Sequence, residues 1–433
     1  MNPIDFLIAV LLVAICGGGR GLRRTYYPNF IKPYIFNLYL RSLFLKIVAV
    51  DRDWQYPAIT EKHAFNKLKS LGIENKAVCY IAFPWATYVD RLKNGKDVKS
   101  ILDSLKTKLI EVDISGFKKV VTVCQHIRLL DIIDTLESLG ITDVFWSHKI
   151  KEQDSKGAIT IHPFPLFPTQ VANPNDSNVK DILYSFVGAR STQWYLTNVR
   201  ELILDCLKSS DDVVIKGREA WHYNDVVYKK QVQGIELAKE VLDKNQDNEK
   251  EFLDVMRRSK FALCPSGAGP NSIRLWECVE MGIVPVILAD TYAAPKSLGV
   301  FESSTVIVSE SELGVLSLDE TIRGISVRKY QQMLDNLLSL KLLYGSGNFV
   351  YDIVQFIFGI ESTSKPGFLD AANMPPKLLA ISLSSKILIG EIVEEIEIRR
   401  YVSLIKKGIT SSDYEFMKVL KLACESKSID CEC

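Results

Sequence analysis

Short apolar runs alternate with amphipathic segments along most of the chain, and this alternation predicts an α/β fold. In the first half, the predicted strands are Ile47–Val50, Ala77–Phe83, Lys119–Val123 and Val144–Phe145, and the predicted helices are Ala64–Leu71, Val98–Leu109 and Leu129–Leu139. Strands that alternate with helices are typical of a parallel sheet covered on both faces. We therefore expect a Rossmann-like domain here.

The same alternation resumes further along, so a second α/β domain is expected. Ile161–Asn178 is rich in proline and asparagine and indicates a linker between the domains. The strands predicted after it are Asp181–Val187 and Val213–Ile215, and the helices are Thr197–Leu207, Val226–Asp243, Glu249–Ser259 and Tyr330–Leu340.

One stretch of the second half has the clearest pattern, which is strand, glycine-rich turn, helix and strand. Its strands are Phe261–Cys264 and Val284–Leu288, and its helix is Asn271–Met281, which Gly282 ends. The glycines of the intervening Pro-Ser-Gly-Ala-Gly-Pro turn permit a positive φ. A turn and a helix N-terminus after a parallel strand offer free N–H groups to an anion. The stretch therefore predicts an anion-binding site.

The polar residues of that helix suggest which anion. Arg274 and Glu277 lie three residues apart on one face, and Ser272 lies in the first turn. A hydroxyl and a guanidinium beside a glycine-rich turn suit a diphosphate, and a carboxylate one turn further on suits ribose hydroxyls. An ordinary helix with a weak surface ion pair would give the same pattern, so both interpretations stay open.

The stretch resembles the nucleotide-sugar half of the exostosin family of glycosyltransferases. The family pattern runs F-x-L-x-P-x-G, then S-x-R-x-x-E, then G-x-x-P-V-I-x-x-D. The matching residues are Phe261, Leu263, Pro265, Gly267, Ser272, Arg274, Glu277, Gly282, Pro285, Val286, Ile287 and Asp290. Weaker agreement extends from Leu183 to Leu337.

The resemblance implies a GT-B architecture, in which two Rossmann-like domains face a cleft. It also implies transfer of a sugar from a nucleotide donor, commonly UDP-linked, to a glycan or glycoconjugate acceptor. The expected parts are a basic N-terminal segment over residues 1–45, an acceptor-side domain over 46–166, a nucleotide-sugar-binding domain over 167–345 and a helical C-terminal extension over 346–433. Two helices of the extension, Glu391–Lys407 and Tyr414–Cys424, are expected to brace the other domain or to bind a partner.

The donor site is expected at the strand ends of the second domain. Gly188 and Arg190 follow one predicted strand and Lys216 follows the next, where basic side chains could face the donor phosphates. Each of these charges could equally be a solvated loop charge. The expected nucleotide-sugar-binding residues are Gly188, Arg190, Lys216, Ser266, Gly267, Ser272, Arg274, Glu277 and Asp290. Replacing Glu277 with alanine is expected to weaken donor binding without unfolding the protein.

Inverting transfer requires a base that takes the proton of the acceptor hydroxyl. His126 follows a predicted strand of the first domain, and Asp90 and Asp53 occupy comparable loop positions. His222 is a further candidate from the donor side. The sequence names these candidates and does not choose among them.

Asp51 and Asp53 also form an Asp-x-Asp pattern, with which GT-A glycosyltransferases hold a divalent metal and the donor diphosphate. A metal-dependent transferase that uses this pair is the alternative enzyme, and a non-catalytic module that binds glycan or nucleotide is the alternative outside enzymes. The exostosin-like stretch lies far downstream and suits a GT-B enzyme. We therefore expect no metal and no cofactor besides the UDP-sugar substrate.

Composition excludes several other classes. A net charge near +1 argues against a nucleic-acid binder, and nine scattered cysteines indicate buried thiols in a reducing compartment. Phe6–Cys16 is apolar but too short to span a bilayer. From Gly17 to Val50, basic and aromatic residues occur without an acidic one, which favours contact with an anionic membrane surface or a basic helix packed on the domain. We expect a cytoplasmic enzyme, peripheral at the membrane face.

Overall fold

The computed structural model describes residues 45–361, apart from residues 72, 74, 173–178, 220–234, 237, 296–299 and 348. Several predictions concern residues outside these ranges. They are the membrane contact of the N-terminal segment, the role of His222 and the two helices of the C-terminal extension. In the part of the chain that is described, no helix is both long and apolar enough to cross a bilayer.

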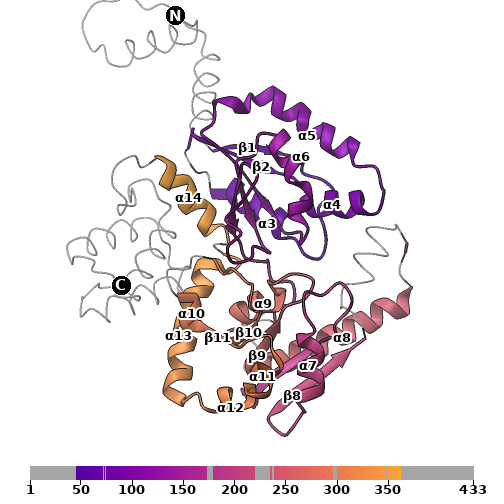
Figure 1. Ribbon diagram of the computed structural model, residues 1–433, viewed down its shortest axis with the longest axis vertical. Helices are drawn as coiled ribbons and strands as arrows, with labels where there is room; N and C mark the ends of the chain where they lie inside the picture. Colours follow the sequence, from indigo (N-terminus) through magenta and orange to yellow (C-terminus); the bar gives the residue numbers. More distant parts are fainter. Residues whose placement is uncertain are drawn as a thin grey trace, which may run out of the picture. The chain divides into compact units, whose positions relative to one another are not determined.

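The first sheet is built from the first half of the chain (Figure 1). Its strands pair in the order β1 (Lys46–Ala49), β2 (Val78–Ala82), β3 (Lys119–Cys124), β4 (Asp143–Trp146), β6 (Ile159–Pro163) and β5 (Ser155–Lys156). All pairs are parallel except β5 with β6. The helices are α3 (Thr60–Leu71), α4 (Trp85–Lys93), α5 (Lys99–Val112) and α6 (Ile133–Ser138).

Both faces of this sheet are buried, as the apolar runs predict. In β2, Cys79 and Ile81 face one core with α4, α5 and α6, while Tyr80 and Ala82 face another core with α3. Successive side chains of a strand point to opposite faces, so a strand covered on both faces needs an unbroken apolar run.

The second sheet has a different strand order. Its parallel strands run β11 (Val306–Ile307), β10 (Val284–Leu288), β9 (Ser259–Pro265), β7 (Ile182–Ala189) and β8 (Val213–Arg218). The chain enters at β7, moves outward to β8 and then returns past β7 to β9. The helices are α7 (Val199–Cys206), α8 (Lys239–Arg258), α9 (Ile273–Met281), α10 (Val300–Ser304), α11 (Glu312–Leu316), α12 (Leu318–Arg323) and α13 (Val327–Tyr344).

Several predicted boundaries were wrong. Residues 161–163 belong to strand β6 and not to a linker, because their main chain pairs with β4. Helix α8 runs without a break through residues 244–248, where a gap between two helices was predicted, and residues 220–234 lie outside the description. Strands β7 and β8 continue through Ala189 and Arg218, so Gly188 and Lys216 lie within strands and not after them.

Helix α14 (Tyr351–Glu361) follows the second sheet in the chain but packs on the first. The Phe356 ring lies 5.6 Å from that of Phe145 and 5.1 Å from that of His162, centroid to centroid. The Asn75 side-chain amide also donates to the Ile357 carbonyl oxygen over 3.3 Å. The start of the predicted extension therefore braces the first sheet.

Main-chain contacts also link the loop after β4 to the loop after β10. Ile150 and Tyr292 form an antiparallel bridge, and the Lys151 N–H donates to the Thr291 carbonyl oxygen over 2.9 Å. Two α/β sheets, parallel except for β5 and joined in one compact unit, confirm the predicted GT-B fold class. The domain boundaries and the cleft stay predictions.

Candidate functional site

The strand order of the second sheet reverses between β7 and β9. The connection from β7 leads away to β8, and the connection from β8 leads back across to β9. In open parallel sheets, ligands bind outside the carboxyl ends of the strands where the strand order reverses in this way. Gly188, at the end of β7, and Ser266 and Gly267, directly after β9, lie at this point.

Two arginines bridge β7 and β9 at the same point. Arg200 donates from Nε to the Ser266 carbonyl oxygen (2.9 Å) and from Nη1 to the Ala189 carbonyl oxygen (3.4 Å). Arg274 donates from Nη1 to the Leu263 carbonyl oxygen (3.1 Å) and from Nη2 to the Val187 carbonyl oxygen. Arg200 therefore lies nearer to the carboxyl ends of the strands than Arg274 does.

Neither arginine forms an ion pair with an acidic side chain of the described residues. Instead, Arg200 lies over the Tyr195 ring (4.9 Å), and Arg274 lies over the rings of Phe186 (5.0 Å) and Phe252 (5.5 Å). Burial, helped by the neighbouring charge of Arg274, lowers the pKa of Arg200 to about 10, so it remains protonated at neutral pH. The two charged guanidinium groups therefore create a positive electrostatic potential at the carboxyl ends of β7 and β9.

The position of both arginines in their helices is unusual. Arg200 is the second residue of α7, and Arg274 is the second residue of α9. A cation in the first turn opposes the helix dipole, which favours negative charge there. The sequence prediction missed Arg200, although this unfavourable position is a signal that could have found it.

Two other predicted basic residues are paired with acidic side chains. Arg190 is half exposed and contacts Glu201 and, at 3.5 Å, Asp205. Lys216 is half exposed and contacts Glu251. These pairs match the interpretation of both residues as solvated surface charges.

Ser266 and Asp290 are joined through Glu310, which the sequence prediction also missed. The Glu310 carboxylate accepts hydrogen bonds from Ser266 Oγ, from Thr197 Oγ1 (3.0 Å) and from the Asp290 N–H (2.9 Å). In return, the Asp290 carboxylate accepts from the Glu310 N–H (3.2 Å) and from Ser309 Oγ (3.1 Å). This network fixes the loops after β9 and β10 relative to each other.

Glu277 is buried and holds the segment before the second sheet. Its carboxylate accepts from the Gln170 N–H (2.9 Å) and from Thr169 Oγ1 (3.1 Å), while Ser272 is the N-cap residue of the same helix. Burial raises the pKa of Glu277 to about 7. Removing the carboxylate would leave a buried N–H unsatisfied, which costs about 1–3 kcal/mol. A ribose role for Glu277 therefore stays a prediction, beside a structural role.

The glycine-rich turn packs against a histidine, His148, from the loop after β4. Neither Gly267 nor Gly269 has a positive φ, so the turn does not use the conformation that these glycines permit. A Cβ on Gly269 would come well within 3.0 Å of His148 Nδ1. His148 is buried, its Nδ1 has no hydrogen-bond partner among the residues that the structure describes, and burial lowers its pKa to about 3. The side chain that lies against the turn is therefore a neutral imidazole.

Replacing Gly269 with alanine is expected to destabilise the protein by about 1–3 kcal/mol, because the buried imidazole must move. Gly267→Ala is the matched control, since its Cβ would lie 3.5 Å from Arg200 Nη2, an ordinary contact. Urea unfolding of both variants measures the difference. Adding His148→Ala to Gly269→Ala should recover part of the loss, and equal effects of the two alanines would contradict this explanation.

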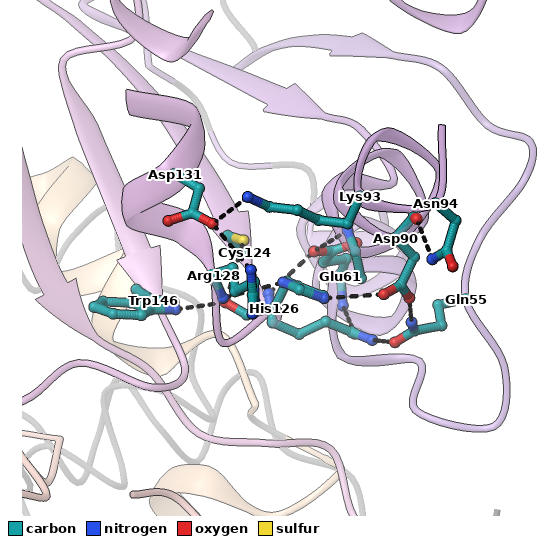
Figure 2. A network of polar contacts seen from close by, with 12 residues as sticks. Gln55, Glu61, Asp90, Lys93, Asn94, Cys124, His126, Arg128, Asp131 and Trp146 are labelled. Atoms are coloured by element: carbon teal, nitrogen blue, oxygen red, sulfur yellow. Dashed lines mark hydrogen bonds and ion pairs between the residues drawn. The ribbon is translucent and has the colours of Figure 1, made fainter. Parts of the chain in front are cut away.

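Of the predicted catalytic residues in the first half of the chain, His126 and Asp90 form a pair (Figure 2), and Asp53 lies apart from it. His126 Nε2 lies 3.2 Å from Asp90 Oδ1. Asp53 has a positive φ of 59° and pairs with Arg91 at 2.9 Å instead. Asp51, the other member of the Asp-x-Asp pattern, accepts from Trp54 Nε1 over 2.8 Å.

Comparison with known proteins identifies the domain that contains most of these residues. Residues 122–318 match the family model of the Exostosin GT47 domain. A probable glycosyltransferase of Arabidopsis thaliana is 35% identical over 91 residues, which cover 21% of this chain and 17% of that protein. The exostosin-1 homolog of Caenorhabditis elegans is 25% identical over 178 residues, 40% of this chain and 44% of that protein. The chain thus spans less than half the length of these relatives.

Solved structures give weaker similarity. An α-glucosyltransferase in complex with UDP and DNA matches with a TM-score of 0.38 and 16% identity, over 75% of this chain and 95% of that one. A putative UDP-N-acetylglucosamine 2-epimerase from Listeria monocytogenes matches with a TM-score of 0.37 and 10% identity, over 75% of this chain and 98% of that one. Both scores lie below 0.5, so the fold assignment rests on the strand order. The family match confirms the resemblance of Phe261–Asp290 to the exostosin family, because these residues lie within the matched range 122–318.

Proposed function

We propose that this chain transfers a sugar from a nucleotide donor, UDP-linked, to a glycan or glycoconjugate acceptor. The exostosin GT47 domain supports the class of enzyme. We further propose that transfer inverts the anomeric carbon and needs no metal or other cofactor.

The observation that carries the proposal is the pair of arginines between β7 and β9. Arg200 and Arg274 have no acidic partner in the described part of the chain, and they lie where the strand order reverses. A diphosphate would neutralise their charge and would accept hydrogen bonds from main-chain N–H groups at the start of α9. The same charges would stabilise the negative charge that develops on the leaving UDP.

On the acceptor side, we propose that the pair of His126 and Asp90 removes the hydroxyl proton. Both side chains are 13% exposed, so solvent or substrate can reach them. They follow β3 and β2, at the same edge of a parallel sheet. Asp53 is not part of this pair, because Arg91 holds it.

Two alternatives remain to be separated by experiment. A metal-dependent transferase would use Asp51 and Asp53, although within residues 45–361, gaps excepted, no group of three or more possible metal ligands is found. A binding module would hold UDP or glycan without turnover.

UDP release from a panel of UDP-sugars, with a crude glycan extract as acceptor, tests the proposal. We expect the full chain to release UDP from one donor, and the release to survive EDTA. Loss of release in EDTA would indicate the metal-dependent alternative. UDP binding without release from any donor would indicate a binding module and contradict the transferase.

We also propose that the protein works in a reducing compartment, the cytoplasm. Cys79, Cys124, Cys206, Cys264 and Cys278 are free thiols, and the Sγ atoms of the last two lie 3.8 Å apart without a bond. Peripheral membrane contact concerns residues 1–45, of which the structure describes only the last.

A further inference from the structure

The hydrogen bonds around His126 define which of its ring nitrogens carries a proton. Nδ1 lies 3.0 Å from the Arg128 main-chain nitrogen. A main-chain N–H can only donate, so Nδ1 is the acceptor and the neutral ring carries its proton on Nε2. Nε2–H therefore donates to Asp90 Oδ1 over 3.2 Å. Both nitrogens of His126 are occupied, and neither is left to accept a proton from a substrate.

Asp90 is placed differently, because it only accepts. Its Oδ2 accepts from Gln55 Nε2 over 2.7 Å, and its Oδ1 accepts from His126. A carboxylate has about four lone-pair sites, so about two are left for a substrate hydroxyl. Figure 2 shows the Asp90 carboxylate between these two donors, while Lys93 turns to Asp131.

The nearby cations are bound elsewhere. Lys93 pairs with Asp131 at 2.7 Å, Arg128 lies 3.6 Å from the same carboxylate, and Arg91 pairs with Asp53. Among the described residues, no lysine or arginine forms an ion pair with Asp90. The carboxylate is thus held by two directional donors, which leave its remaining lone pairs accessible.

A buried glutamate sets the distance between Asp90 and His126. The Glu61 carboxylate accepts from the Ala86 N–H (3.2 Å), in the first turn of the helix that carries Asp90. It also accepts from the Gln125 N–H (3.0 Å), the residue before His126. Burial raises the pKa of Glu61 to about 8. Through these hydrogen bonds, Glu61 holds the start of α4 next to the end of β3.

Gln125 completes the connection and orients Gln55. Its Oε1 accepts from the Glu61 N–H (3.1 Å), and its Nε2 donates to Gln55 Oε1 (2.8 Å). Gln55 must then present its amide N–H, not its oxygen, to Asp90. Each hydrogen bond in this series can be donated in only one direction. The last one is donated by Gln55 and accepted by Asp90.

We propose that Asp90 is the general base of the transferase and that His126 and Glu61 are positioning residues. This inference rests on the proposed function. The acceptor O–H bond breaks and its proton goes to Asp90, while an oxygen lone pair forms the bond to the anomeric carbon. The bond from that carbon to the diphosphate oxygen breaks, and its electron pair leaves with UDP.

An assay with azide in place of the hydroxyl acceptor distinguishes a general base from a residue that is needed for donor binding or folding. It is an anion without a proton, so it attacks the anomeric carbon without a base. We expect Asp90→Asn to lower UDP release with water or glycan hydroxyls as acceptor about 10²–10⁴-fold, the usual contribution of a general base. Azide-dependent UDP release and UDP affinity should stay within about threefold of the wild type. His126→Gln should lower UDP release with hydroxyl acceptors only about tenfold, because the base Asp90 remains in place.

Asp103→Asn, an exposed aspartate on α5, is the matched control and should change neither reaction. If Asp90→Asn keeps full activity with hydroxyl acceptors, Asp90 is not the base, although the transferase stands. Loss of azide-dependent release as well would also overturn the assignment. If His126→Gln loses as much as Asp90→Asn and keeps azide-dependent release, the base is His126. No UDP release by the wild type with any acceptor would contradict the proposed function itself.

Discussion

Replacing Arg200 with methionine is expected to weaken UDP binding by at least thirtyfold, whereas Arg190→Met should change it by less than about threefold. Removing one partner of a desolvated charge–charge contact costs about 2–5 kcal/mol, which corresponds to about 30-fold to several-thousand-fold in affinity. Arg200 is partly buried at the strand ends without an acidic partner, so a diphosphate would supply its missing counter-charge. Arg190 already has Glu201 and Asp205.

Isothermal titration of both variants with UDP measures this difference. Arg200→Met also leaves the Ser266 and Ala189 carbonyl oxygens without their donor, so thermal unfolding is needed to show that the variant is folded. Arg200→Lys is a second check, because it keeps the charge but loses the planar fork, and it should bind between the wild type and Arg200→Met. Equal losses for Arg190→Met and Arg200→Met, or none for Arg200→Met, would refute the proposed diphosphate contact.

Replacing Trp276 with alanine is expected to lower the free energy of unfolding by about 3–5 kcal/mol, the usual cost of deleting a buried tryptophan side chain. Trp276 is 1% exposed and packs edge-on against Tyr344, with ring centroids 5.8 Å apart. Its Nε1 donates to Asn271 Oδ1 over 2.9 Å. Asn271 in turn donates to the Ser147 carbonyl oxygen over 2.8 Å. Deleting Trp276 would therefore also weaken the contact between α9 and the loop after β4.

Trp194→Ala is the control for this prediction. It removes the same side chain from a position that is 66% exposed, and surface substitutions usually stay within about 0.5 kcal/mol. Chemical denaturation of both variants gives the comparison. Similar unfolding free energies for the two would contradict the packing assigned to Trp276.

The sequence predicted the α/β class and the stretch around α9 well, because both depend on local periodicity. The predicted helix Asn271–Met281 and strand Val284–Leu288 differ from α9 and β10 by two residues at most. Arg274 was found because it lies inside a recognisable pattern. The same reasoning chose Arg190, since it follows a predicted strand.

Arg200 and Glu310 could not be predicted in this way. Arg200 connects carbonyl groups of β7 and β9, and those strands become neighbours only through the crossover from β8. Glu310 contacts Ser266 across 44 positions of the chain. Burial of Glu277 likewise depends on residues 169 and 170, which lie more than 100 positions earlier. Such contacts follow from the register of the sheet and not from local spacing.

Helix α14 has a consequence for how the protein is made. Asn75 and Ile357 are 282 positions apart, yet the helix that carries Ile357 covers the first sheet. At about 5–20 residues per second, a ribosome needs roughly 15–55 seconds between them. During that time Phe145 and His162 have emerged without the Phe356 ring that covers them in the finished protein. The first sheet therefore completes its packing only after the second sheet has been synthesised, and a nascent chain needs protection from aggregation on that face.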